Sequence, residues 1–262
     1  MKELTILITK YLPYSTYFFL IFVRVFGIVY FFPFFNSMSV PWQVKAGLAA
    51  IMSFVILPFF KFQVISFDIW ELGIAVIREL CVGLSLGFII QIIFDGIHLA
   101  GQIVGYQMGF AIVNVIDPYM NTQISIIARF KGLLALLIFF SLNAHYLVIS
   151  GLLKSFELVP IAGWTFKNRM AAQLIRWTGD IFIMALKIAS PVLVTLFLTN
   201  IALALIARTM PQINVFIIGF PLEIGIGFLM LGITMPFFSW CFRQFFEKGL
   251  YEMWFNLRLG GL

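Results

Sequence analysis

Residues 188–207 read IASPVLVTLFLTNIALALIA and contain no charged side chain between Lys187 and Arg208. An α-helix rises about 1.5 Å per residue, so roughly 20 residues are enough to cross the hydrocarbon core of a bilayer. Four more stretches of similar length also lack Lys, Arg, Asp and Glu: residues 25–44, 96–116, 132–153 and 224–242. Because such stretches are too long for the core of a soluble domain, they indicate that lipid surrounds much of the chain.

The composition of the 262 residues is that of a membrane protein, with 62% hydrophobic residues, 11% charged residues and a mean hydropathy of +1.06. A soluble domain has about 25% charged residues. The net charge of +6 comes from basic residues scattered along the chain, so we expect no nucleic-acid partner. Cys81 and Cys241 lie in apolar stretches without the spacing of a metal site or a disulfide framework, and we expect packing thiols and no cofactor.

The apolar stretches predict an all-α integral membrane protein with six or seven helical segments joined as hairpins. We place these segments at residues 14–35, 46–60, 70–94, 97–117, 132–153, 181–207 and 214–242. The second segment has only fifteen residues between Lys45 and Lys61. It must therefore be tilted, lie in a thinned bilayer, or fail to span.

Charged residues also occur inside these segments, where lipid disfavours them. A charge near the middle of a bilayer costs roughly 2.5 to 3.5 kcal/mol even on the mildest scale, so such side chains must face protein or water. Two interpretations remain open: structural ion pairs inside a helical bundle, or the polar lining of a conduit or proton relay. The residues concerned are Arg24, Arg78, Glu79, Lys187 and Glu223.

Glycines recur at helical spacing in two neighbouring segments. Gly101, Gly105 and Gly109, which we call the glycine strip, repeat every four residues, and Gly83 and Gly87 repeat the pattern earlier. Small residues at this spacing allow helix backbones to approach closely. The strip leads into Met108 to Ile116 and then into Asp117-Pro118, where the proline must break the helix. The strip is thus either plain helix packing or the approach to a non-helical segment inside protein.

The stretch RTMPQINVFIIGFP, residues 208–221, interrupts the last two apolar segments. Its two prolines, its glycine and the side chains of Gln212 and Asn214 cannot lie unsatisfied in lipid. We therefore predict a structured hairpin turn or a re-entrant loop.

Five motifs together resemble the FliR/SctT family, the membrane proteins of bacterial flagellar and type III secretion export gates. They are GYQMG at 105–109, Asp117-Pro118, Ala128-Arg129, LNAH at 142–145, and RTMPQINVFIIGFPL at 208–222. The resemblance covers essentially the whole chain. It implies a subunit that helps to form and plug the channel for unfolded flagellar subunits, or its injectisome counterpart.

The resemblance also implies an architecture and partners. Members of the family look like a fusion of a FliP-like part, here residues 1–180, with a FliQ-like hairpin, here residues 181–262. Their kinked hairpins lie partly out of the membrane plane. The implied partners are FliP-like and FliQ-like gate subunits, FlhB-like and FlhA-like export proteins, exported polypeptides and membrane lipid. The implied location is the bacterial inner membrane, at the flagellar basal body, and no enzymatic activity is implied.

Two groups of residues receive roles from the resemblance. Residues 107–117 look like the pore plug of the family, an apolar stopper that blocks ions by dewetting. The plug residues are Gly105, Met108, Gly109, Phe110, Ile112, Val113, Asn114 and Asp117. The second group is a hairpin that contacts neighbouring subunits: Arg208, Pro211, Gln212, Asn214, Phe216, Gly219, Phe220 and Pro221.

Two rival functions are less well supported by the residues. A secondary transporter with a site at Arg78, Glu79 and Lys187 predicts internal structural repeats, and none is found. An intramembrane enzyme requires a catalytic motif, but His98 and His145 stand alone, without H-E-x-x-H or G-x-S-x-G. Both histidines are expected to pack or to form hydrogen bonds.

Overall fold

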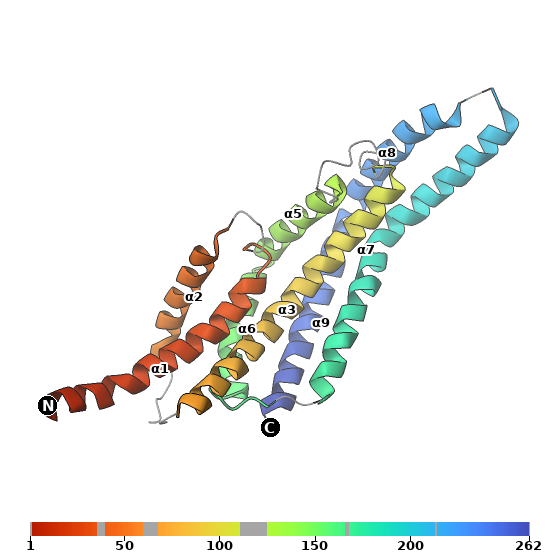
Figure 1. Ribbon diagram of the computed structural model, residues 1–262. Coiled ribbons are helices and arrows are strands. Elements are labelled where there is room, and N and C mark those ends of the chain that lie inside the picture. Colours follow the sequence, from red (N-terminus) through yellow and green to blue (C-terminus); the bar gives the residue numbers. More distant parts are fainter. Residues whose placement is uncertain are drawn as a thin grey trace. The chain divides into compact units, whose positions relative to one another are not determined.

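The computed structural model describes residues 2–35, 40–59, 68–110, 125–165, 168–212 and 214–261. Within these ranges the chain forms helices and their connections, and no strand (Figure 1). The helices are α1 (Lys2–Phe31), α2 (Trp42–Ile56), η1 (Leu57–Phe59), α3 (Ile69–Gln107), α5 (Ile126–Ser141), α6 (Ala144–Leu158), α7 (Asn168–Thr209), α8 (Val215–Ile233) and α9 (Met235–Gly261). The prediction of an all-α protein is therefore confirmed.

Four helical stretches in the described part of the chain are long and apolar enough to cross a membrane: Tyr14–Phe31, Trp42–Phe59, Ile69–Gln107 and Ile175–Thr209. Two broken pairs, α5 with α6 and α8 with α9, raise the number to six if each pair forms one span. These counts agree with an integral membrane protein.

The chain divides into two compact units. The first unit comprises Met1–Gln91, Asn143–Ile175 and Lys248–Leu262, and the second comprises Ile92–Leu142 and Arg176–Glu247. The first unit holds α1, α2, α6 and the beginning of α3. The second holds the end of α3, α5, most of α7, α8 and the beginning of α9.

The predicted break between residues 94 and 97 is wrong, because α3 runs without interruption from Ile69 to Gln107. Gly96 lies at this position and serves helix packing. A Cβ atom at Gly96 would lie 3.1 Å from Sδ of Met184 on α7. The glycine thus lets a methionine side chain approach the helix, and the helical hydrogen bonds continue past it.

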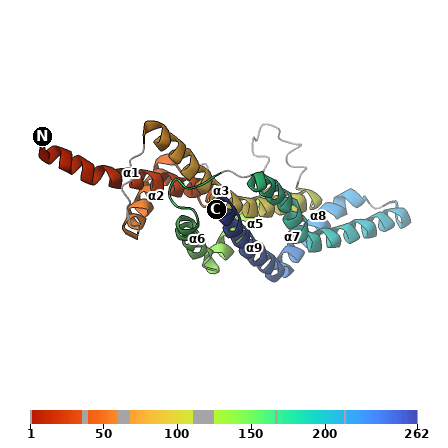
Figure 2. The same ribbon diagram turned by 90° about the horizontal axis from the view of Figure 1, so that it is seen from below.

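The short second segment is a helix of the first unit. α2 packs against α1, and its 3-10 extension η1 follows directly (Figure 2). Only one face of α2 is buried, at Ala49, Ser53 and Ile56. On the outer face Phe54 remains 70% exposed. α2 therefore has one face for α1 and one for lipid or another protein.

Prolines inside the helices are compensated or produce bends. Pro191 in α7 cannot donate to the carbonyl of Lys187, and the hydroxyl of Ser190 donates to that oxygen at 2.9 Å instead. Pro236 has the larger effect, because α8 and α9 meet at Thr234 with a bend of 58°. A proline at the second residue of α9 cannot continue the hydrogen bonds of α8.

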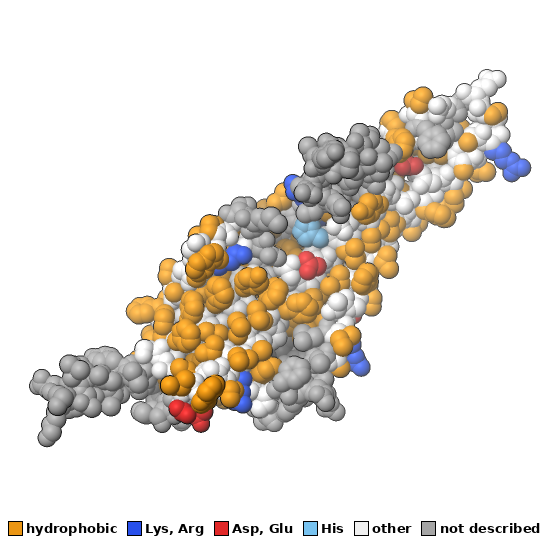
Figure 3. Space-filling model, viewed as in Figure 1, with side chains coloured by type: hydrophobic (Ala, Val, Ile, Leu, Met, Phe, Trp, Pro, Cys, Tyr) orange, Lys and Arg blue, Asp and Glu red, His pale blue; other side chains and the backbone are white. Residues whose placement is uncertain are grey.

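Large apolar side chains cover much of the surface. Figure 3 shows hydrophobic side chains over the visible face, with few charged ones among them. Examples are Trp70 on α3, which is 81% exposed, and Phe182, Val194 and Phe197 on α7. Exposed apolar area on this scale requires lipid or partner proteins as its surroundings.

Candidate functional site

The predicted plug begins at the end of α3. Its first four residues, Gly105, Met108, Gly109 and Phe110, belong to the described part of the chain. Ile112, Val113, Asn114 and Asp117 lie outside the described residues. The prediction that the helix continues to Asp117 is wrong, because α3 ends at Gln107.

Gly109 ends α3 through a Schellman cap. Its φ angle of +83° is left-handed, a conformation that glycine adopts without the steric penalty of a side chain. The N–H of Phe110 donates to the carbonyl of Gly105 at 3.1 Å, and the N–H of Gly109 donates to that of Tyr106 at 3.1 Å. These two bonds are the pair that defines the motif. Gly109 therefore stops the helix, whereas Pro118 was the expected breaker.

The capped end of α3 rests on α8 within the second unit. Met108 is fully buried, and a Cβ atom at Gly227 would meet its side chain at 2.5 to 2.8 Å. A Cβ at Gly109 would lie 2.9 Å from the ring of Phe220. The ring of Phe110 meets that of Phe228 edge-on, with centroids 6.2 Å apart. The fold thus brings the start of the predicted plug against Phe220 of the predicted subunit-contact hairpin.

The other two residues of the glycine strip face α5 in the same unit. A Cβ at Gly101 would lie 2.5 Å from Cα of Ala128, and a Cβ at Gly105 would overlap Oγ of Ser125. That hydroxyl is buried and has no hydrogen-bond partner among the described residues. The glycine strip is thus a helix-packing surface up to Gly105, and a cap at Gly109.

The predicted hairpin from Arg208 to Pro221 is mostly helical. α7 ends at Thr209, and α8 already begins at Val215, so the turn is shorter than the sequence suggested and Pro221 lies inside α8. Gly219 is buried next to Leu203, Phe220 is half-buried, and the side chain of Phe216 is outside the described residues. The exposed members are Arg208, Pro211, Gln212, Asn214 and Pro221. The turn between α7 and α8 is therefore exposed.

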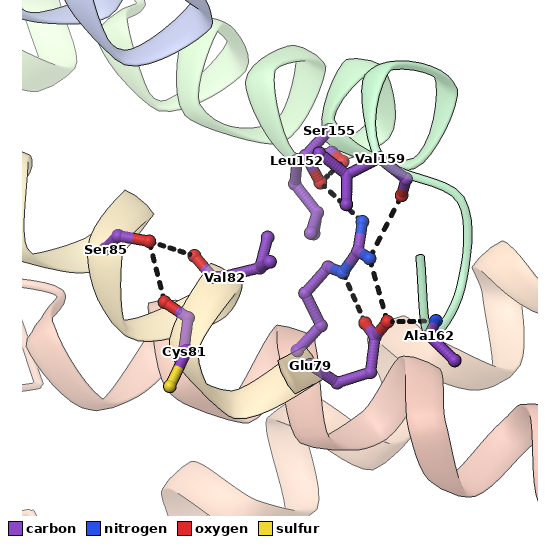
Figure 4. Close-up of polar contacts among 9 residues, drawn as sticks. Glu79, Cys81, Val82, Ser85, Leu152, Ser155, Val159 and Ala162 are labelled. Carbon is purple, nitrogen blue, oxygen red and sulfur yellow. Dashed lines mark hydrogen bonds and ion pairs between the residues drawn. The ribbon is translucent and has the colours of Figure 1, made fainter. Parts of the chain in front are cut away.

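The first unit contains an ion pair with no exposed side-chain surface (Figure 4). Arg24 Nε donates to Glu79 Oε2 at 2.5 Å, and Arg24 Nη2 donates to Oε1 at 3.0 Å. The guanidinium also donates to Ser155 Oγ at 3.3 Å and to the carbonyl of Val159 at 3.1 Å. The backbone N–H of Ala162 donates to Glu79 Oε1 at 2.9 Å.

This arrangement satisfies both charges inside the protein. The carboxylate accepts three hydrogen bonds, and the guanidinium stacks on Phe156, 4.2 Å from its ring centre. Each part of the planar fork of the guanidinium thus has a partner, as a buried arginine requires. The geometry favours the structural ion pair over an open polar conduit at this point.

Glycines make that ion pair possible, because they let α1 and α3 approach closely beside it. A Cβ on Gly83 would overlap the carbonyl oxygen of Arg24, and a Cβ on Gly27 would lie 2.9 Å from the backbone of Gly83. Gly87 is packed against Phe31 in the same way, at 2.8 Å. Gly83 and Gly87 are thus the small-residue contact between two helices that the spacing indicated.

The other charged residues that the sequence places inside apolar segments are not deeply buried. Arg78 is half-buried and donates to the carbonyl of Ala162 at 2.9 Å. Glu223 is half-buried in α8. Lys187 is exposed, with its ammonium 5.2 Å from the ring centre of Trp240 and 5.7 Å from that of Phe245. Arg78 and Glu79 belong to the first unit, and Lys187 belongs to the second.

Sequence reasoning missed Lys131, which is buried in α5 with 4% exposure. It was read as the charged boundary of the apolar stretch 132–153. The available signal was its helical neighbourhood, since Ala128 and Ala135, three residues before and four after it, are also buried. Small residues at that spacing mark the buried face of the helix.

Comparisons with known proteins cover nearly the whole chain. Residues 15–249 match the family model described as bacterial export proteins, family 1. The flagellar biosynthetic protein FliR of Escherichia coli K12 is 33% identical over 227 residues, 86% of this chain and 87% of its own length. The FliR protein of Bacillus subtilis 168 is 32% identical over 250 residues, 94% and 96% of the two chains. The FliR protein of Aquifex aeolicus VF5 is 29% identical over 225 residues, which are 86% of this chain and 87% of that protein.

Proposed function

Because this chain belongs to the bacterial export proteins, family 1, we propose that it is a subunit of the flagellar type III protein export gate. It helps to form and to close the membrane channel through which unfolded flagellar subunits are exported. The relatives are named as flagellar proteins, which favours the flagellum over the injectisome. The chain is a membrane-embedded structural component of protein export, located in the bacterial inner membrane at the flagellar basal body.

The closing element is the segment that follows Gly109. The observation that supports it is the Schellman cap, which stops α3 at a fixed residue and turns the chain away from the helix. Met108 and Phe110 hold this turn on α8, through Gly227 and Phe228. Ile112 and Val113 then supply the apolar stopper, and an apolar constriction excludes ions by dewetting.

The exposed apolar surface belongs to contacts with other gate subunits. The first 180 residues form a FliP-like part, and residues 181–262 form a FliQ-like hairpin around the turn between α7 and α8. FliP-like and FliQ-like subunits cover faces such as the outer side of α2 and of α7, where Phe54 and Phe197 are exposed. FlhB-like and FlhA-like proteins complete the apparatus near the exposed turn at Pro211 and Gln212.

Replacing Phe110 and Val113 with alanine tests the plug. The assembled gate is expected to form in normal amounts, and the membrane is expected to conduct small ions at rest. Loss of the Phe110–Phe228 edge contact, worth about 1 kcal/mol, loosens the start of the plug, while the smaller residue at 113 widens the constriction. Conductance of the gate in a planar bilayer is the measurement.

The matched control for the plug is Leu133→Ala, which removes an exposed apolar side chain from α5 of the same unit. It should leave the resting conductance at the wild-type level. If the conductance of the Phe110 and Val113 variant were unchanged, the proposal that this segment closes the pore would be wrong.

Purification of a tagged chain in mild detergent tests the assembly. Mass spectrometry of the co-purifying proteins is expected to find FliP-like and FliQ-like subunits, in a complex several times larger than the 29.9 kDa of this chain. A stable monomer with substrate uptake of its own would instead support the secondary transporter.

A further inference from the structure

Lys131 carries a charge inside the second unit that its surroundings satisfy only in part. Its ammonium nitrogen lies 5.7 Å from the ring centre of Phe238, and among the described residues this is its one polar or ring interaction. A cation–π contact contributes on the order of 0.5 to 2 kcal/mol, whereas removing an ammonium from water costs several kcal/mol. The nitrogen therefore requires a hydrogen-bond acceptor.

A small cavity lies beside this side chain. It has a volume of about 10 Å³ and is located between α5 and the bend where α8 meets α9. The volume is close to the minimum that holds one water molecule. Its lining residues are Phe130, Lys131, Leu134, Leu231, Thr234, Met235 and Phe238.

The bend offers one acceptor in the wall of the cavity, the side chain of Thr234. The hydroxyl of Thr234 donates to the carbonyl of Met230 at 2.7 Å, which leaves its oxygen able to accept. A cation is favourable here, because lysine side chains near a helix C-terminus stabilise its last carbonyls.

We propose that this cavity is a binding site for one water molecule, which joins Lys131 to the bend. The water accepts a hydrogen bond from the Lys131 ammonium and donates to the hydroxyl oxygen of Thr234. Lys131 is thus a positioning residue that holds the end of α8 against α5. Two polar partners are within the range found for buried waters.

The consequence for the gate rests on the proposed function. Gly227 and Phe228, which support Met108 and Phe110, lie about two turns before the bend at Thr234. Fixing the end of α8 therefore fixes the support of the plug. Without the water-mediated link, α8 can shift along α3, and the resting position of the plug becomes less defined.

Hydrogen exchange of the backbone amides tests the site in the purified, assembled complex. In the Lys131→Met variant, amides in residues 230–235 are expected to exchange about tenfold faster than in the wild type, because the end of α8 opens more often. The control Lys187→Met removes an exposed lysine of the same unit and should leave these rates unchanged. Thr234→Val, which removes the hydroxyl, should accelerate exchange about threefold.

Lys131→Gln separates the bridging water from an ion pair with another chain. Glutamine has no charge but still donates N–H groups, so exchange should stay within about threefold of the wild-type rate. Exchange as fast as in Lys131→Met would show that the charge itself is needed, as for a partner's carboxylate, and would overturn the proposal. Wild-type rates in Lys131→Met would also overturn it. Because exchange reports the bend directly, these results do not depend on whether the segment after Gly109 closes the pore.

Discussion

Replacing Glu79 with alanine is expected to remove most of the folded chain from the membrane. The substitution leaves the guanidinium of Arg24 with no exposed surface and no counter-charge. It also removes the acceptor for the N–H of Ala162. Breaking one partner out of a buried pair costs on the order of 3 to 5 kcal/mol, which is a large part of the stability of a typical domain. The measurements are the amount of chain in the membrane fraction and the swimming motility of the cells.

Two further variants serve as a control and as a test of rescue. Glu71→Gln changes an exposed carboxylate on the same helix and should have little effect. The double variant Arg24→Met with Glu79→Leu removes both charges and should restore much of the lost protein, since apolar residues can replace a buried ion pair. Restored protein without restored motility would mean that the charges also serve export. A double variant with no more protein in the membrane than Glu79→Ala would contradict the prediction that apolar residues can replace the pair.

Replacing Gly105 with valine is expected to stop assembly of the gate, or its opening, and to abolish export. The new Cβ would occupy the position of Ser125 Oγ, and the two methyl groups would push α5 away from α3. Rotation of the Ser125 hydroxyl would still leave its Cβ 3.1 Å from the new carbon atom. Overpacking of a close helix contact costs about 1 to 3 kcal/mol. Gly109→Val should act as strongly, because valine cannot adopt the positive φ of +83° without strain.

Gly73→Val provides the control, because Gly73 lies on the same helix and a Cβ atom added there would meet nothing within 4 Å. Gly105→Val and Gly73→Val both remove a glycine from α3, so only the packing differs between them. Export can be measured as the secretion of flagellar subunits into the medium, and assembly as the size of the purified complex. Normal export in Gly105→Val would mean that α5 does not need to approach α3 at this point.

The apolar segments could be predicted from the sequence because crossing a membrane is a local property of roughly 20 residues. The close approach at Gly83 and Gly105 was also visible, since small residues at intervals of four define one helix face. The residues at which the helices end were harder to predict from the sequence. Gly96 and Gly109 are the same residue type, yet one packs against a side chain and the other adopts a left-handed cap.

The candidate site also has features that could be predicted from the sequence and features that could not. The sequence indicated that Arg24 and Glu79 had to face protein, but these residues are 55 positions apart and nothing local pairs them. It also indicated that Lys187 had to face protein or water, and it marked Lys131 only as the end of an apolar stretch. The structure buries the first and exposes the second, because the neighbouring helices differ.

By itself, the sequence determined that this protein is helical, lies in a membrane and belongs with the export proteins, because apolar length, glycine spacing and motifs are local features of the chain. Only the tertiary structure decided that Arg24 pairs with Glu79, that α3 stops at Gly109 against Phe220, and that Lys131 faces the bend of α8. Each of these depends on which helices lie side by side. That choice is made by the packing of whole faces, so no single stretch of sequence contains it.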